Sequence, residues 1–331
     1  MKHILSIALV LVVVTIGHSK QLRAEDEPED AAYSKVLEEA NAAYNEGKYD
    51  AAEEGYVLAV QARPEEAVPY RNLARTYFWQ SDYAPAVAYY DMYMQQASGA
   101  EDIEQVRAER KLASSRAGGE PWAVPESQQM ALSALEEQLD SGSAYTRGGG
   151  GAWGLYQTLL RTGFAQPELA RLRRQVVSRL LGEFEGRLVT DTDQPTPRLD
   201  LEDWQIQKER LDAAKSVSSD PAVNEALARR SLIPETATAL LNGRYEQAVT
   251  LAKEAGEENP DMPFIRWFEV SALVEADQAE RALEAVDALA KSLEDSAPQH
   301  LGYVRIVRAS VLERLGRHDE AADIYLGVIV D

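Results

Sequence analysis

The chain has 331 residues, and its 34 lysines and arginines are outnumbered by 55 aspartates and glutamates, which gives a formal charge of −21. A balance this acidic argues against binding to nucleic acid, which requires a basic surface, and against binding to anionic membranes. Cysteine is absent, which excludes disulfides, thiol catalysis, cysteine metal sites and a cysteine-linked lipid anchor.

The first residues predict an export signal. A mostly apolar run at 4–16 is too short to cross a bilayer comfortably but has the length of a signal-peptide core. Cleavage is expected after Ala24, which makes 1–24 the signal, while Ser19 is a competing site and an uncleaved membrane anchor is the alternative. Residues 25–32 would form a short, acidic and disordered lead-in. We therefore expect a periplasmic or secreted protein with no membrane span in its mature chain.

One six-residue phrase recurs along the chain. Two copies lie 34 residues apart near the N-terminus and three more follow in the C-terminal part, at 47–52, 81–86, 243–248, 277–282 and 316–321. Each copy begins with glycine or a small polar residue, which readily takes the left-handed turn that ends a helix. Each ends with alanine, whose small side chain lets two helices approach closely. The phrases therefore predict helical hairpins.

These phrases resemble the tetratricopeptide repeat, a helix–turn–helix unit of 34 residues. The resemblance implies an all-α solenoid of stacked helical hairpins, because one unit cannot bury its apolar face alone. It places an N-terminal array at 33–117 and a C-terminal array at 199–331. The recognisable units cover roughly half of the chain.

Between the arrays, 118–198 is predicted to be a degenerate helical region without the signature alanine. Helices are expected at 127–139, 152–162 and 167–181. Four consecutive glycines, 148–151, invite comparison with a phosphate-binding loop. The lysine and the Ser/Thr that such a loop requires are missing, and no strand precedes it. We interpret 141–151 as a flexible loop instead.

The helix expected at 167–181 is basic in an otherwise acidic chain. It carries Arg171, Arg173, Arg174 and Arg179. These arginines either face solvent and pair with neighbouring acidic residues, or they form a site for an anion or an acidic partner.

Motifs for catalysis and metal binding are missing from the sequence. There is no HExxH zinc motif and no GxSxG elbow. Outside the predicted signal the histidines are His300 and His318, which lie far apart in sequence, and the carboxylates are spread over helix faces. We therefore expect no catalytic residue, no metal site and no cofactor, and a protein that is not an enzyme.

The resemblance implies that the first helix of each unit lines a concave groove. In the N-terminal pair of units, the groove-facing residues that we expect to bind a peptide are Asn41, Tyr44, Arg71, Asn72, Arg75 and Phe78. Two guanidinium groups one helical turn apart suit a carboxylate, so the expected ligand is an extended, acidic or C-terminal peptide. Alternatively, the arginines only neutralise Glu38 and Glu39.

Asn41 and Asn72 also match two asparagines of the carboxylate clamp with which some members of the family hold a peptide's C-terminus. The first lysine of that clamp is replaced by Leu37. The cations expected in the third unit are replaced by Asp102 and Val106.

The resulting hypothesis is a scaffold of the cell envelope or secreted space that binds a protein or peptide. The alternatives are an assembly subunit whose repeats stack on other subunits, and an accessory to an envelope enzyme or a very divergent enzyme. The apolar face of the last helix, at 321–330, suggests either self-association or contact with a partner. Trp267 fits either the core or a groove contact, depending on a one-residue difference in register.

Overall fold

The computed structural model describes residues 29–119, 121–188, 197, 199–296 and 298–330; the expected export signal lies outside them. The first part contains α2 (Glu29–Asn45), α3 (Tyr49–Ala62), α4 (Val68–Trp79), α5 (Tyr83–Gln96) and α6 (Ile103–Arg116). The middle contains α7 (Glu126–Ser141), α8 (Gly151–Arg161), α9 (Glu168–Leu188) and α10 (Leu201–Val217). The last part contains α11 (Pro221–Leu241), α12 (Tyr245–Glu258), α13 (Ile265–Glu275), α14 (Ala279–Ser296), the 3₁₀ turn η1 (Pro298–His300), α15 (Leu301–Arg314) and α16 (His318–Val330).

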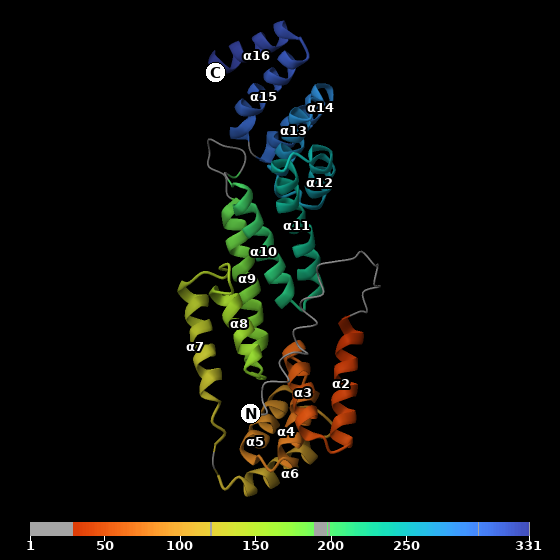
Figure 1. Ribbon diagram of the computed structural model, residues 1–331, viewed down its shortest axis with the longest axis vertical. Coiled ribbons are helices and arrows are strands. Elements are labelled where there is room, and N and C mark those ends of the chain that lie inside the picture. Colours follow the sequence, from red (N-terminus) through yellow and green to blue (C-terminus); the bar gives the residue numbers. More distant parts are fainter. Residues whose placement is uncertain (1–28, 120, 189–196, 198, 297, 331) are drawn as a thin grey trace.

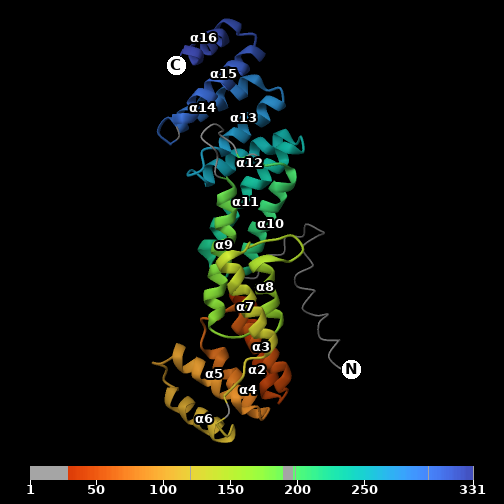
Figure 2. The same cartoon turned by 90° about the vertical axis from the view of Figure 1, so that its left-hand side faces the viewer.

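The helices form an elongated stack of antiparallel hairpins (Figures 1 and 2). Helices α2 to α6 make one end, α7 to α10 the middle, and α11 to α16 the other end. Consecutive helices pair as hairpins and each hairpin packs on the next within the two end segments. The predicted all-α solenoid of stacked hairpins is confirmed. Helix α2 begins at Glu29, inside the segment expected to be a lead-in.

The recurring phrase forms the same turn in all five copies. Its first residue has a positive φ each time, namely Gly47 (75°), Ser81 (66°), Gly243 (71°), Asp277 (56°) and Gly316 (73°). The N–H of the next residue then donates a hydrogen bond to the carbonyl five residues earlier, as in Lys48 to Ala43 and Gln278 to Leu273, each with an N···O distance of 2.9 Å. This is the Schellman geometry, which satisfies a free carbonyl at the end of the first helix.

The last residue of the phrase lies at the closest approach of two helices. The alanines Ala52, Ala86, Ala248 and Ala282 have no exposed area, and Ala321 is 1% exposed. A larger side chain at any of these positions would overpack the contact.

Replacing Asp277, which has a positive φ, by glycine is predicted to stabilise the protein. Asp277→Gly is expected to raise the free energy of unfolding by about 0.5–1 kcal/mol, because aspartate pays a steric cost at positive φ that glycine avoids. Urea denaturation measures the change. The matched control is Gly243→Ala, at the equivalent turn 34 residues earlier, which should destabilise the protein instead. An unchanged midpoint in both variants would contradict the assignment of strain.

The buried side chains divide into an N-terminal core, a core shared by the middle and the start of the C-terminal array, and two further clusters in the C-terminal array. The N-terminal core includes Tyr56, Tyr70 and Leu73. The shared core begins in α7 and continues through α8 to α12 into α13, ending at Phe268. Trp267 is 3% exposed and meets Tyr303 edge-on at 5.2 Å. The core assignment of Trp267 is therefore the correct one.

The glycine-rich segment before α8 is held by specific contacts rather than being an open flexible loop. Gly148, Gly149 and Gly151 all have positive φ, and a Cβ on Gly154 would lie 1.7 Å from the Gly149 oxygen. Arg147, within the same segment, forms ion pairs with Glu202 and Glu209 of α10. Glycine therefore allows the left-handed backbone at Gly148 and Gly149, and it allows close backbone packing at Gly151 and Gly154.

A polar joint connects the N-terminal array to the middle. Arg173 of α9 is 8% exposed, and its Nη1 donates to the Ala62 carbonyl at 2.8 Å and to Ser219 Oγ at 2.7 Å. Its Nη2 donates to the Gln61 carbonyl. These carbonyls end α3, where the helix dipole is negative, so a buried cation is favourable there. The Gln61 side chain in turn donates to the Leu160 carbonyl at 2.8 Å.

Candidate functional site

The six residues predicted for the groove lie together on the first helices of the N-terminal array. Asn41 and Tyr44 come from α2, and Arg71, Asn72, Arg75 and Phe78 from α4. Asn41 is exposed and the other five are not fully buried. Asn72 Nδ2 lies 3.4 Å from Asn41 Oδ1, which also accepts a 2.7 Å bond from the Tyr56 hydroxyl. We call the surface of α2, α4 and α6 that carries these residues the first-helix face.

Both arginines on this face are paired with carboxylates, Arg75 with one in α6 and Arg71 with the residue that precedes α6. Arg75 makes a two-pronged contact with Glu109, with Nε and Nη2 at 2.9 and 2.8 Å from the two oxygens. Arg71 donates through Nη1 to Asp102. The arginines are thus neutralised, as the alternative interpretation expected. The partners are Asp102 and Glu109 rather than Glu38 and Glu39, because α6 is the helix that faces α4.

The two arginines differ in how completely their donors are used. The fork of Arg75 is matched by both oxygens of one carboxylate, which is the strongest geometry for such a pair. Arg71 Nε is buried and has no hydrogen-bond partner in the described part of the chain. The Arg71 guanidinium also lies 5.7 Å from the centre of the Tyr93 ring. Arg71 is therefore the less saturated of the two cations.

The surroundings keep both carboxylates ionised. Hydrogen bonds from the Tyr93 hydroxyl and from Arg71 hold the pKa of Asp102 below its usual value. Burial raises the pKa of Glu109, but hydrogen bonds from Arg75 and Gln105 outweigh it and leave that pKa lowered. A lowered folded pKa contributes stability above the unfolded value of about 4. That contribution is lost as the pH falls through the folded pKa.

The residues that replace the cations of the carboxylate clamp do not supply a substitute for them in the structure. Leu37 is half-buried beside the N-terminal core, and Val106 has no exposed area. Asp102 points its carboxylate at Arg71. The first-helix face therefore presents asparagines, arginines and their own carboxylate partners, which differs from a purely cationic clamp.

The carboxylates are site residues that the sequence analysis missed as partners. Glu109 stands 34 residues after Arg75, so the repeat spacing itself placed the two at equivalent positions of adjacent units. That spacing was the signal that could have identified the pair.

The basic helix α9 uses most of its arginines within the protein. Arg171 pairs with Glu136 at 2.8 Å, Arg173 is in the joint described above, and Arg179 donates to the Gly142 carbonyl at 3.1 Å. A depression of about 780 Å³ beside them is also lined by Asp140 and Glu183. The internal-pairing interpretation therefore accounts for these three arginines.

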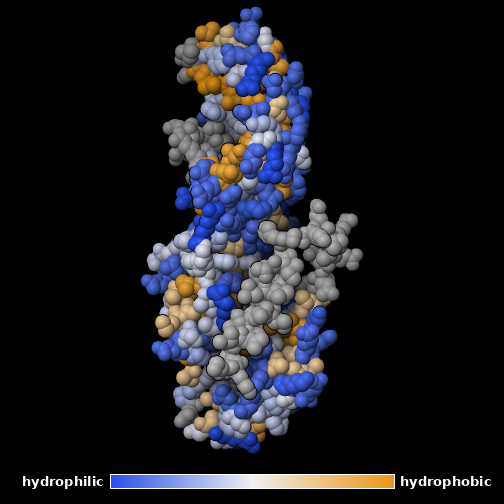
Figure 3. Space-filling model, in the orientation of Figure 1, coloured by the Kyte–Doolittle hydropathy of each residue, from blue (hydrophilic) through white to orange (hydrophobic). Residues whose placement is uncertain are grey.

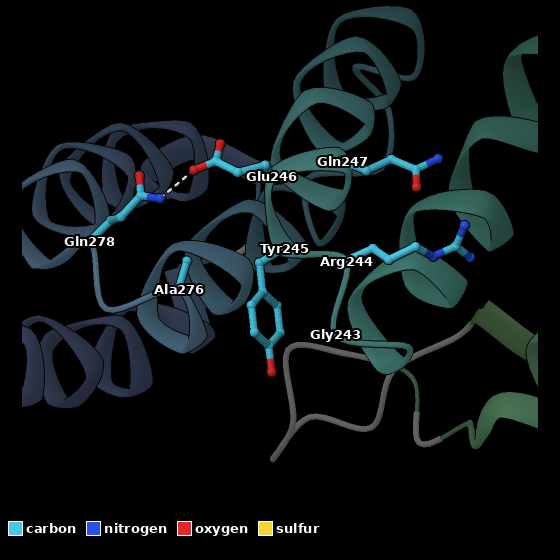
Figure 4. Close-up of a pocket in the computed structure, with 7 residues that line it drawn as sticks. All are labelled: Gly243, Arg244, Tyr245, Glu246, Gln247, Ala276 and Gln278. Carbon is cyan, nitrogen blue, oxygen red and sulfur yellow. Dashed lines mark hydrogen bonds between the residues drawn. The ribbon is translucent and has the colours of Figure 1, made fainter.

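A second hollow lies at the turn ends of the C-terminal array, where Figure 4 shows its seven lining residues. Gln278 donates to Glu246 across it. The side chains of Arg244 and Gln247 point away from this pair, and the ring of Tyr245 extends separately. The polar groups do not converge on one point, so the hollow offers no evident chemistry.

Two negative findings apply to the residues that the structure describes. No group of three or more histidine, aspartate or glutamate side chains is arranged to hold a metal ion. Within the same residues, none of the helices combines the length and apolar character needed to cross a membrane.

Exposed apolar side chains gather over α15 and α16 at one end of the molecule (Figure 3). Leu326 is 63% exposed and Ile306 is 41% exposed. This end is the second surface at which another chain could pack.

Comparison with known proteins gives fold-level likeness only. No protein-family model and no curated protein matches the chain. A tetratricopeptide repeat protein from Parabacteroides merdae matches with 13% identity over 91% of this chain and 93% of its own, at a TM-score of 0.28. The TPR2AB domain of yeast Sti1, in its complex with pHSP90, matches with 15% identity over 88% and 99%, at a TM-score of 0.25. Scores this low transfer neither a site nor a partner.

Proposed function

Because the chain folds as a tetratricopeptide-repeat protein, we propose that it is a non-enzymatic interaction scaffold whose first-helix face binds an extended segment of a partner protein. One observation carries the proposal. Asn41, Asn72 and the two arginines gather on neighbouring helices of the most regular array, where Asn41 is exposed and the other three side chains are partly exposed. These are side chains that recognise peptide backbone and carboxylates.

The internal ion pairs shape which ligand fits. An acidic side chain or a peptide C-terminus has to displace Asp102 or Glu109 from an arginine, so binding is an exchange of carboxylates. Arg71, which is held by its carboxylate through one nitrogen where Arg75 is held through two, is the favoured entry point. Such an exchange gives modest affinity for any single acidic group and favours a longer segment that also contacts Asn41 and Phe78.

The experiment starts from a library of displayed peptides with free C-termini, selected on the purified protein. Replacing both arginines (Arg71→Ala with Arg75→Ala) should weaken the selected peptides at least tenfold, roughly 1.4 kcal/mol. Asp102→Asn with Glu109→Gln should strengthen them, because the competing carboxylates are removed. Fluorescence anisotropy measures both, and circular dichroism should show unchanged helix content.

Arg107→Ala is the matched control. Arg107 is exposed on α6 and pairs with Glu104, three residues earlier on the same helix. Its loss should leave binding unchanged. Equal affinity of the parent and the double arginine variant would place the binding surface elsewhere on the molecule.

The export signal predicted from the sequence supports a site of action in the periplasm or outside the cell. N-terminal sequencing of the protein isolated from its host decides this part of the proposal, since a retained Met1 would contradict cleavage.

A role as an assembly subunit is the second candidate, favoured by the exposed Leu326 and Ile306 on α16 and α15. Their apolar surface suits contact with another chain or a second copy. The mass of the protein in solution, measured by light scattering, decides whether it self-associates.

A further inference from the structure

A file of aromatic rings follows the turn edge of the N-terminal array. We call it the aromatic rail; its members are Tyr44, Tyr49, Phe78, Trp79 and Tyr83, and Arg116 lies at its end. Tyr44 meets Tyr49 at 5.7 Å, and Tyr49 stacks on Trp79 at 6.3 Å with ring planes 7° apart. Phe78 contacts Trp79 at 6.0 Å and Tyr83 at 5.4 Å. Each ring thus touches the next across helices α2 to α5.

The repeat spacing produces the rail. Tyr44 and Phe78 are 34 residues apart, and so are Tyr49 and Tyr83. Each unit therefore contributes one ring from the end of its first helix and one from the start of its second. Trp79 fills the position between the two units, so the rings continue from one unit to the next.

The rail reaches solvent at Trp79, its other rings are half-buried, and it ends in a cation. Trp79 is 58% exposed. The Arg116 guanidinium lies 5.1 Å from the centre of the Phe78 ring and 5.6 Å from that of Tyr83. Its hydrogen bond goes to the Tyr83 hydroxyl at 3.3 Å, and it forms no ion pair within the described residues. By contrast, Arg71 and Arg75 on the same array are already paired with carboxylates.

We infer that the aromatic rail binds a proline-rich segment of the partner, in polyproline II conformation and followed by an acidic residue that pairs with Arg116. This inference rests on the proposed scaffold function and names the chemistry of its ligand. A row of partly exposed rings, with Trp79 the most open of them, suits flat pyrrolidine rings, as in other aromatic-lined grooves that bind proline.

The spacing of the two partners agrees. Packed helices lie about 8–10 Å apart. A polyproline II helix repeats its face every three residues, which is a similar distance of about 9 Å. Prolines at every third position can therefore contact rings of successive units. The preformed conformation also lowers the entropy that the ligand loses on binding.

The test uses two labelled synthetic peptides, an oligoproline that ends in two glutamates and the same oligoproline ending in two glutamines. Fluorescence anisotropy with the parent protein should show tighter binding of the glutamate peptide. Trp79→Ala should weaken both peptides at least about fivefold, since each stacked ring contributes on the order of 1 kcal/mol. Arg116→Gln should weaken only the glutamate peptide and remove the difference between the two.

Trp153→Ala is the matched control, because Trp153 is a partly exposed tryptophan of α8 outside the rail; it should leave both affinities unchanged. No binding of either peptide would overturn the inference. So would binding of a soluble oligosaccharide, instead of oligoproline, that depends on Trp79. Library peptides that still require Arg71 and Arg75 would then show that the scaffold function survives without the rail.

Discussion

Arg173→Met is expected to lower the free energy of unfolding by about 2–4 kcal/mol. The side chain is 8% exposed and holds the Gln61 and Ala62 carbonyls at the end of α3. Methionine has similar length but no donor, so these acceptors lose their partner in a buried joint, at about 1–3 kcal/mol for each unsatisfied group. Urea denaturation followed by circular dichroism measures the loss.

The same variant should separate the motions of the N-terminal array from those of the middle. The two parts have largely different cores, although Ala165 between α8 and α9 packs in the N-terminal one, and the polar joint supplies hydrogen bonds between them. Hydrogen exchange by mass spectrometry should therefore rise in 49–62 more than in α10.

Arg171→Met is the matched control on the same helix. Arg171 is about half exposed and pairs with an equally exposed Glu136, and such surface pairs contribute at most about 1 kcal/mol. If both variants lose the same small amount of stability, the buried joint is not a stabilising element.

The hairpin fold was predictable because its determinants are local. A left-handed turn residue and an alanine five positions later fix the end of one helix and its approach to the next, and both recur in the sequence. At Ser81 and Asp277 the turn is kept even though neither residue is glycine. The surrounding hairpin therefore imposes the left-handed conformation. The whole six-residue phrase predicts this turn better than the presence of glycine does.

The joint at Arg173 could not be predicted, because its partners are distant backbone carbonyls. Arg173 and Ala62 are 111 residues apart, and a bond from a side chain to a carbonyl leaves no pattern at the accepting residue. Trp267 was undecided for a different reason. A shift of one residue in register turns a helix by about 100°, which is enough to move a side chain from core to groove.

The shared face of the six candidate residues was predictable, but its electrostatics were not; their role in binding stays a prediction. Helical periodicity places Arg71, Asn72 and Arg75 on one face of α4, and the structure agrees. Whether the arginines are free depends on which helix packs next to them. Asp102 caps the start of α6 and Glu109 lies within it. Their contact with α4 is tertiary, and they change the face from cationic to internally paired.

Trp204→Ala is expected to have the largest effect of any single substitution considered, lowering the free energy of unfolding by about 3–5 kcal/mol. Trp204 of α10 is 2% exposed and meets Phe268 of α13 edge-on, with ring centres 5.8 Å apart. Its removal leaves a cavity in the core shared by the middle and the C-terminal array. Hydrogen exchange should rise in α9 to α13, whereas the N-terminal array, with its own core, should change little.

Trp79→Ala provides the comparison, since the same residue type is removed from an exposed position. It should change stability by about 0.5 kcal/mol or less while weakening the proline-rich peptides. Trp204→Ala should do the reverse, with reduced stability and unchanged peptide affinity at temperatures where it remains folded. Equal destabilisation by the two variants would contradict the shared core at Trp204. Trp204→Ala therefore tests the core that joins the middle to the C-terminal array, and Trp79→Ala tests the aromatic surface of the N-terminal array.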